Sequence, residues 1–336
     1  MSIDSLFTGR VLDGQKKDLP VLATKENTRG RTFIVTGANS GLGLEAARHY
    51  VSLGAAKVIM AVRNMAAGEK ARADVEATTK TSGIAEVWQL DLASYDSVKA
   101  FAARANTELE RIDALIENAA LALDRWEWAE GHESTTTINV YSTFLLAILL
   151  LPKLKASVKS GNTPHLVIVT SGSGFMLKDV ILSTRDDLLG RMDIQEQFNP
   201  QVRYPTTKIV EIFAGRYLST LISVSRTGVV LNYIDPGLCV TNLNTKGSDA
   251  MREFVEGHRQ KYGARTAEMG SRTLLHAAVA GPESHGCLLA SCENQDDRVP
   301  EWVTDEDGQK LQKQIWESIA RELSRVAPGC VDAALA

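Results

Sequence analysis

A tyrosine and a lysine stand four residues apart in Tyr204-Pro205-Thr206-Thr207-Lys208. At that spacing two side chains share one face of a helix. The ordinary pKa of tyrosine is about 10, so the residue exchanges protons near neutral pH only where its anion is stabilised. We expect the ammonium of Lys208 to lower the pKa of Tyr204. The pair predicts a general acid/base, with an exposed helix pair as the alternative.

A glycine-rich turn, Thr36-Gly37-Ala38-Asn39-Ser40-Gly41-Leu42-Gly43, follows an apolar run at residues 32–35. A strand that ends in such a turn and leads into a helix directs free backbone N–H groups outward, which suits a pyrophosphate. Glycines also mark ordinary tight turns. Together with the tyrosine–lysine pair, the turn predicts a bound dinucleotide.

Two later residues indicate which dinucleotide binds. In an NAD-binding unit an acidic residue about 20 positions past the turn bonds the ribose 2′-hydroxyl, whereas an arginine accommodates a 2′-phosphate. Arg63 holds that place relative to Gly43, so the sequence predicts NADP(H), with a solvated loop cation as the alternative. Asp91 could accept from the adenine amino group or cap the following helix.

Short apolar runs alternate with longer helical stretches from residue 31 onward. The expected strands are 32–36, 57–62, 85–89, 114–118, 165–170, 228–234 and 287–290, and the expected helices are 41–53, 65–79, 95–110, 133–157, 205–223 and 265–280. This alternation predicts an α/β fold, a Rossmann-type doubly wound parallel sheet of about seven strands with helices on both faces. Ligands of such sheets bind at the carboxyl ends of the strands.

These motifs, in this order, resemble the short-chain dehydrogenase/reductase family over about residues 30–290. The resemblance implies catalytic roles for Asn139, Ser171, Tyr204 and Lys208. It implies cofactor contacts for Gly37, Asn39, Ser40, Gly41, Leu42, Gly43, Arg63, Asp91, Leu92, Asn118, Tyr204, Lys208, Pro236, Gly237, Val240 and Thr241. The segment 286–328 resembles the tails of retinol-dehydrogenase-like fungal members that act in small-molecule biosynthesis.

The resemblance also gives three of these residues particular tasks. Ser171 would polarise a substrate carbonyl, with Thr170 and Ser173 as rival hydroxyls. Asn139 would kink its helix and hold a water that links Lys208 to solvent, whereas a satisfied core amide is the plain alternative. Thr241 would bond the nicotinamide carboxamide or the phosphates.

The chain departs from the family pattern in one motif, and Pro205 complicates another. Glu117-Asn118-Ala119-Ala120 stands where the family has Asn-Asn-Ala-Gly, and Glu117 puts the usual polar network of the central sheet in question. Pro205 disfavours helical geometry at Tyr204, so we expect the helix to begin or kink there while the one-turn relation to Lys208 survives.

Composition excludes several classes of function. The 336 residues are 44% hydrophobic and 23% charged, with a formal net charge of −4, which gives no basic field for nucleic acid or an anionic membrane. The apolar run at 144–151 is too short to span a bilayer. Four sparse cysteines favour reduced thiols over a zinc site or disulfides, and we expect no bound metal. No signal peptide is apparent, which predicts a cytoplasmic protein.

We expect an N-terminal extension over residues 1–30, one catalytic domain over 31–292 and a C-terminal extension over 293–336. The family's dimer faces correspond to residues 144–151 and the helix after Pro205, so a homodimer forms unless the extensions cover them. Side chains expected near a substrate lie in 121–131, between Ser171 and Tyr204, and after Thr241. They include Trp126, Trp128, Phe175, Met176, Leu177, Leu243 and Phe254.

The hypothesis is an NADP(H)-dependent oxidoreductase that reduces a ketone or aldehyde of an apolar small molecule, or oxidises the matching alcohol. Tyr204 delivers the proton in the direction of reduction. Two alternatives stay open: a non-redox isomerase, dehydratase or cyclase that uses the same fold and cofactor, and an NADPH-binding regulatory module without chemistry.

Overall fold

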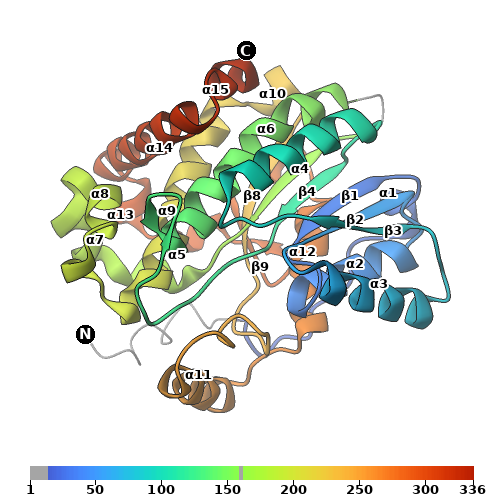
Figure 1. Ribbon diagram of the computed structural model, residues 1–336, viewed down its shortest axis with the longest axis horizontal. Helices are drawn as coiled ribbons and strands as arrows, with labels where there is room; N and C mark the ends of the chain where they lie inside the picture. The colour runs from blue at the N-terminus through green and yellow to red at the C-terminus, as the bar shows by residue number, and fades with distance from the viewer. Residues whose placement is uncertain (1–13, 159–161) are drawn as a thin grey trace.

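The computed structural model describes residues 14–158 and 162–336, which are arranged around one mostly parallel sheet (Figure 1). The strand order is β10-β9-β8-β7-β4-β1-β2-β3. The strands are β1 (Thr32–Thr36), β2 (Lys57–Val62), β3 (Ala85–Gln89), β4 (Ala114–Glu117), β7 (His165–Val169), β8 (Val230–Asp235), β9 (Leu288–Ala290) and β10 (Glu293–Asn294). The central strands are buried along their length, as their apolar composition requires.

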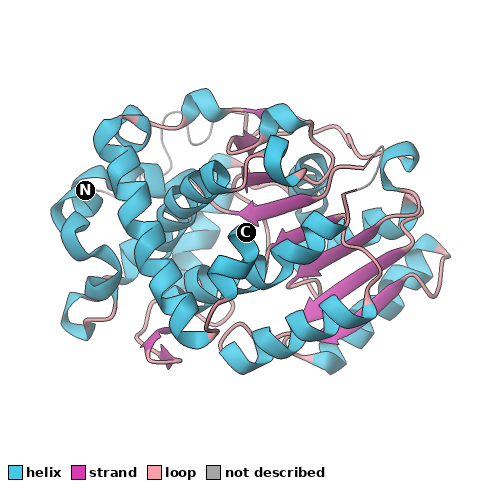
Figure 2. Ribbon diagram, turned by 90° about the horizontal axis from the view of Figure 1, so that it is seen from above, coloured by secondary structure: helices cyan, strands magenta, loops and turns pink. Residues whose placement is uncertain are grey.

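Helices cover both faces of the sheet, so each face has its own apolar core (Figure 2). One face carries α2 (Gly41–Ser52), α3 (Met65–Thr79) and α12 (Ala267–Ala277). The other carries α4 (Tyr95–Glu108), α6 (Thr143–Ala156) and α9 (Pro200–Leu221). The expected doubly wound architecture is confirmed.

The sheet has one strand more than expected. β10 pairs with β9 in antiparallel register, and Ser291 and Cys292 between them have positive φ angles of 52° and 60°. A second, two-stranded sheet consists of β5 (Trp128–Ala129) and β6 (His132–Glu133), joined through Glu130 and Gly131, which also have positive φ angles. These strands are two residues long and carry no periodic signal.

The helix that carries Tyr204 begins earlier than expected. α9 starts at Pro200, and the side chain of Asn199 accepts a hydrogen bond of 3.0 Å from the backbone N–H of Gln201. Proline suits the first position of a helix because its missing N–H would have no partner there. Pro205 is tolerated inside the helix, so the expectation that the helix begins at residue 205 is wrong.

The long helix expected at 133–157 is interrupted. It is divided into α5 (Ser134–Thr136), a π-helical turn (Thr137–Ser142) and α6. By length and composition the run Ser134–Ala156 could cross a membrane, but 83% of its apolar window is buried inside the protein, which identifies it as a core helix. The π turn surrounds Asn139 and supplies the expected irregularity.

The C-terminal residues pack on the face of the sheet that carries α4, α6 and α9. α14 (Glu306–Val326) lies along α9, and α15 (Cys330–Leu335) packs on α6 (Figure 1). The remaining helices are α1 (Lys25–Thr28), α7 (Lys178–Thr184), α8 (Leu188–Met192), α10 (Val224–Thr227), α11 (Asp249–Tyr262) and α13 (Glu301–Thr304). Both faces that the resemblance identifies with dimerisation are therefore covered by this chain's own helices.

Candidate active site

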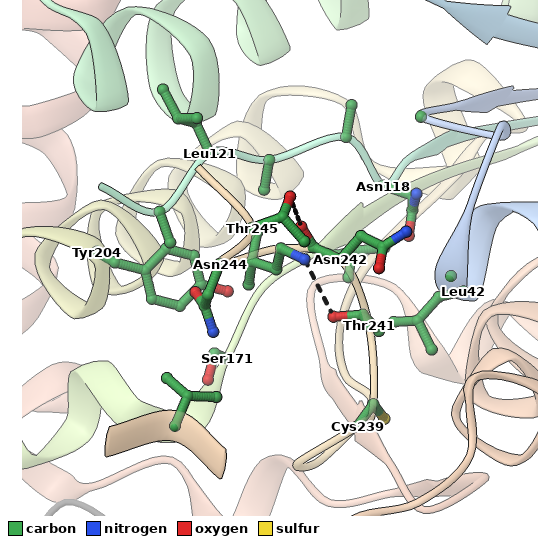
Figure 3. Close-up of a pocket in the computed structure, with 18 of the residues that line it drawn as sticks. Leu42, Asn118, Leu121, Ser171, Tyr204, Cys239, Thr241, Asn242, Asn244 and Thr245 are labelled. Carbon is green, nitrogen blue, oxygen red and sulfur yellow. Dashed lines mark hydrogen bonds between the residues drawn. The ribbon is translucent and has the colours of Figure 1, made fainter. Parts of the chain in front are cut away.

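A cavity of about 950 Å³ opens at the carboxyl ends of the parallel strands (Figure 3). Most of the expected site residues line it, from the glycine turn through the ends of β2 and β3 to α9 and the loop after β8. They are Gly37, Asn39, Ser40, Gly41, Leu42, Arg63, Asp91, Leu92, Asn118, Ser171, Tyr204, Lys208, Pro236, Gly237 and Thr241. The structure thus brings together residues that span more than half of the sequence.

The glycines of the first turn have separate tasks. Gly37 and Gly41 have φ angles of +67° and +57°, which L side chains rarely adopt. Gly43 does not line the cavity; a Cβ there would lie 2.6 Å from Nδ2 of Asn118 and 2.8 Å from the carbonyl oxygen of Gly37. Gly43 therefore lets α2 pack closely against the turn.

The N-terminus of α2 is suited to bind an anion. Ser40 is the N-cap residue, and its side chain makes no capping hydrogen bond. The first N–H groups of a helix have no partner within the helix, and the helix dipole adds positive potential there. Because Ser40 and Gly41 line the cavity, these donors fit a phosphate group inside it.

Arg63 and Asp91 line the cavity beyond this turn. The guanidinium of Arg63 is exposed and, among the residues that the structure describes, makes no hydrogen bond or ion pair. One carboxylate oxygen of Asp91 accepts a 3.0 Å hydrogen bond from the N–H of Ala93. Asp91 therefore stabilises the start of its own loop and still presents a carboxylate to the cavity.

Tyr204 and Lys208 lie on the same face of α9. The Lys208 nitrogen is 5.5 Å from the centroid of the Tyr204 ring. Ser171 follows β7, and its hydroxyl accepts a 3.2 Å hydrogen bond from the N–H of Ser173. Figure 3 shows Tyr204 and Ser171 facing the cavity together with Asn244. The site thus presents two hydroxyl groups to a ligand.

The pKa of Tyr204 is shifted in the direction opposite to the one expected. Burial raises the pKa of Tyr204, and the charges of Glu211, Asp235 and Cys239 raise it further. The Lys208 nitrogen donates to both carboxylate oxygens of Glu211, at 2.8 and 3.1 Å, and to the carbonyl of Val169 at 2.9 Å. In this arrangement the expected lowering of the Tyr204 pKa is not seen, because burial and the three nearby groups raise it above its ordinary value.

Asn139 lies outside the cavity wall and is fully buried. Its amide oxygen accepts from the N–H of Leu121 at 2.8 Å, and its nitrogen donates to the Leu121 carbonyl and the Thr207 hydroxyl, both at 2.9 Å. Its side chain therefore has the contacts of a satisfied core amide that ties the loop after β4 to α9.

The loop after β8 forms another wall, with one exception. Pro236, Gly237 and Thr241 line the cavity, whereas Val240 does not and is 52% exposed. Asp235, which the sequence analysis did not single out, accepts from the N–H groups of Gly172 at 3.0 Å and of Gly237 at 2.9 Å. It thereby joins the turn after Ser171 to this loop.

A helix that the sequence analysis missed covers the outer side of the cavity. Met251, Phe254 and Val255 of α11 line it, as do Asn242, Asn244 and Thr245 of the preceding loop. The N–H of Ser248 donates to the carboxylate of Asp124 at 3.1 Å, which ties this loop to the segment after β4. Asp124 and Ser248 are 124 residues apart, so no local sequence pattern indicates this pairing.

The aromatic and apolar side chains expected near a substrate divide into groups. Leu243 and Phe254 line the cavity. Phe175 and Met176 line a second cavity of about 760 Å³, and Leu177 is buried in the core. Trp126 packs edge-on against Phe198, and Trp128 is 56% exposed. Leu177 and the two tryptophans thus line neither cavity, and Phe175 and Met176 lie outside the main one.

Comparisons with known proteins agree on one family. Residues 31–181 match the family model described as short chain dehydrogenase. The short chain dehydrogenase/reductase dmxR8 of Cryptosporiopsis sp. is 38% identical over 317 residues, which cover 90% of this chain and 93% of the relative. The short chain dehydrogenase atnD of Emericella nidulans is 37% identical over 288 residues, covering 84% of this chain and 90% of the relative.

Solved structures show the same fold. A short chain dehydrogenase from Escherichia coli CFT073 complexed with NADPH has a TM-score of 0.58 at 21% identity, covering 80% of this chain and 99% of that chain. One from Shigella flexneri 2a complexed with NADP has a TM-score of 0.57 at 21% identity, covering 80% of this chain and 100% of that chain.

Proposed function

This chain belongs to the short-chain dehydrogenase/reductase family, and from that premise we propose that it is an NADP(H)-dependent oxidoreductase acting on a ketone or aldehyde, or on the matching alcohol. The observation that carries the proposal is the shared cavity. Tyr204, Lys208 and Ser171 line the same space as the glycine turn and the N-terminus of α2.

The residues of the first crossover fit the adenosine end of NADP(H). The helix N-terminus at Ser40 and Gly41 suits the pyrophosphate, and the guanidinium of Arg63 suits a 2′-phosphate. Asp91 and Leu92 would bind the adenine. Pro236, Gly237 and Thr241 would hold the nicotinamide end beside Tyr204.

Bound NADPH would supply the hydride that the carbonyl carbon receives in reduction. The hydroxyl groups of Ser171 and Tyr204 bind the carbonyl oxygen and orient the substrate. The O–H bond of Tyr204 breaks as its proton passes to that oxygen, which becomes the hydroxyl of the product. Lys208 lies within the same turn of α9 and stabilises the resulting phenolate.

The substrate side of the cavity supports an apolar small molecule with a few polar groups. Leu121, Leu243 and Phe254 provide apolar surface, and the amides of Asn242 and Asn244 provide hydrogen-bonding groups. The relatives named above are fungal short-chain dehydrogenases. We infer that the substrate is an intermediate of small-molecule biosynthesis.

The test is consumption of NADPH with a panel of aromatic and long-chain ketones. Tyr204→Phe should lower kcat by roughly 100-fold or more, because general acid–base catalysis contributes about 10²–10⁴-fold. Tyr217→Phe on the same helix is the matched control, since Tyr217 does not line the cavity. Unchanged turnover in Tyr204→Phe would exclude the assigned role, and NADPH binding without turnover on any ketone would favour a regulatory module.

A further inference from the structure

Three ionisable side chains are buried close to one another beside the cavity. Lys208 and Glu211 of α9 are 2% and 1% exposed, and Glu117 at the end of β4 is 3% exposed. Lysine and glutamate are rarely buried unless they are paired. Glu117 stands where the family has asparagine, and Glu211 is the single acidic residue in the apolar run 209–213.

Every N–H group of the Lys208 ammonium has a hydrogen-bond acceptor. The ammonium has three N–H donors, and the structure gives it three acceptors: two oxygens of Glu211 and the carbonyl of Val169. Glu211 therefore decides where the ammonium lies. It also decides how much positive potential reaches Tyr204, whose ring centroid is 5.5 Å from the lysine nitrogen.

Glu117, the third member of this group, differs from Glu211 in its protonation. Neither of its carboxylate oxygens has a hydrogen-bond partner in the described part of the chain. An ionised carboxylate buried without a partner would cost several kcal/mol, so the side chain is held as the neutral acid. Burial and then the charge of Glu211 raise the pKa of Glu117 well above its ordinary value.

We propose that Glu211 is a positioning residue that draws the Lys208 ammonium to the cavity floor and offsets its charge at Tyr204, with Glu117 as a neutral acid beside it. Where Glu211 is ionised, the three side chains carry no net charge. Burial raises the pKa of Glu211 to about 7, although Lys208 acts against that shift. This proposal rests on the proposed function for its effect on Tyr204, but the protonation of Glu117 and the pairing of Glu211 can be measured without substrate.

The first measurement is thermal unfolding at pH 5 to 8. A carboxyl group whose pKa is raised by folding contributes stability at low pH that is lost as the pH rises above its ordinary value of about 4.3. Glu117→Gln should therefore gain in melting temperature relative to wild type as the pH rises. A growing deficit towards pH 8 would mean that Glu117 is an ionised partner of Lys208, and would overturn its assignment.

Glu211→Gln should have the opposite effect at pH 8. Removing one member of a buried ion pair leaves an uncompensated charge, so we expect the melting temperature to fall by roughly 5 °C. Glu211→Asp keeps the charge and should recover a large part of this loss. The exposed Glu317→Gln on α14 controls for loss of an acidic residue. Equal melting temperatures for Glu211→Gln and wild type would overturn the pairing.

The second measurement is the pH dependence of kcat/KM for alcohol oxidation, in which Tyr204 must lose its proton. Glu211, Asp235 and Cys239 all raise the pKa of Tyr204. The ammonium of Lys208 carries the opposite charge and lies 5.5 Å from the ring centroid of Tyr204. Without the charge of Glu211, the low-pH side of the profile of kcat/KM against pH should shift to lower pH by about one unit. At a given pH on that side, kcat/KM should rise about tenfold. The double variant Glu117→Gln/Glu211→Gln should show the same shift of the pH profile. In this variant Glu117 is no longer there to ionise and pair with Lys208 in place of Glu211.

The outcomes separate the two proposals. If the pH profile of kcat/KM in Glu211→Gln matches that of wild type, Glu211 does not offset the charge of Lys208 at Tyr204. A wild-type protein that turns over no carbonyl compound would overturn the proposed function, while the unfolding data would still decide the states of Glu117 and Glu211.

Discussion

Arg63 is the residue on which the choice of dinucleotide depends. Its guanidinium is exposed at the end of β2 and lines the cavity. A charge-assisted hydrogen bond to a phosphate contributes about 1.5–3 kcal/mol, so Arg63→Ala should weaken NADPH binding by roughly 10–100-fold. NADH binding should change little, because NADH has no 2′-phosphate. Fluorescence titration of both dinucleotides measures the effect.

The exposed Arg29, which lies outside the cavity, provides the control variant Arg29→Ala. An equal loss of affinity for NADPH and NADH in Arg63→Ala would show that the residue supports the turn and does not read the phosphate. That result would leave the oxidoreductase proposal intact and remove its preference for NADP(H).

The sequence predicted the relative placement of Tyr204 and Lys208, but not the hydrogen-bond partners of Lys208 and Asn139. The spacing of Tyr204 and Lys208 placed both on one helix face, because a helical period relates residues four apart. The partner of Lys208 was not foreseen, although an acid in the apolar run 209–213 was a usable signal. Asn139 binds the backbone of Leu121, a contact that depends on tertiary packing.

At the scale of elements, His132 links three parts of the structure. Its ring bonds Asp193 after α8 at 2.6 Å and Glu322 on α14 at 3.1 Å. Burial lowers the pKa of His132, but Asp193 and Glu322 outweigh that effect and raise it. The stabilisation is complete below the ordinary pKa of about 6.5 and is lost as the pH rises through the higher folded value.

We therefore expect the stability advantage of wild type over His132→Gln to shrink between pH 6 and pH 8.5. Urea unfolding at several pH values gives the two free energies of unfolding. Taking the difference at each pH removes the contributions of groups that titrate in both proteins. An advantage that stays constant over this range would mean that His132 acts there only as a neutral hydrogen-bonding group.

The close packing of α2 on the glycine turn gives a second prediction for an element. Gly43→Ala places a Cβ against Asn118 and the carbonyl of Gly37, so the backbone must shift. Overpacking of this kind costs about 1–3 kcal/mol of unfolding free energy, and we expect weaker NADPH binding as well. Gly257→Ala in α11 is the matched control, because nothing lies within 4 Å of its added Cβ.

The elements nearest the first turn were predictable because their local signals agree. β1, β2 and β3 have the expected bounds. The apolar run of β1, for example, lies between Arg31 and Gly37, and that of β2 ends before Arg63. The start of α9 was wrong because Pro205 was interpreted as a helix boundary, whereas Asn199 and Pro200 form the actual start. α11 was missed because no residue of it is buried, so core periodicity does not reveal it.

At the scale of the whole molecule, the C-terminal helices determine which surfaces are available for association. Phe144 of α6 packs edge-on against Trp316 of α14, and Phe213 of α9 packs against Trp302 of α13. Ile319 and Leu323 of α14 are fully buried. The two faces identified with dimerisation are thus already part of this chain's own core.

We expect a monomer for this reason. Light scattering after size-exclusion chromatography should give a mass near 36.5 kDa over roughly 1–100 µM protein. A mass twice as large would require another interface and would contradict the inference from these helices. The sequence suggested that a tail could cover the dimer faces, but the pairing of α14 with α9 joins segments about 100 residues apart and no local pattern encodes it.

α11 has a consequence beyond the shape of the cavity. It supplies side chains to one wall, yet none of its residues belongs to either core. Substitutions on its inner face therefore carry little folding penalty, whereas most core changes do. We expect this helix to be where related enzymes diverge fastest in substrate choice, and where a mutant library would yield altered specificity without loss of soluble protein.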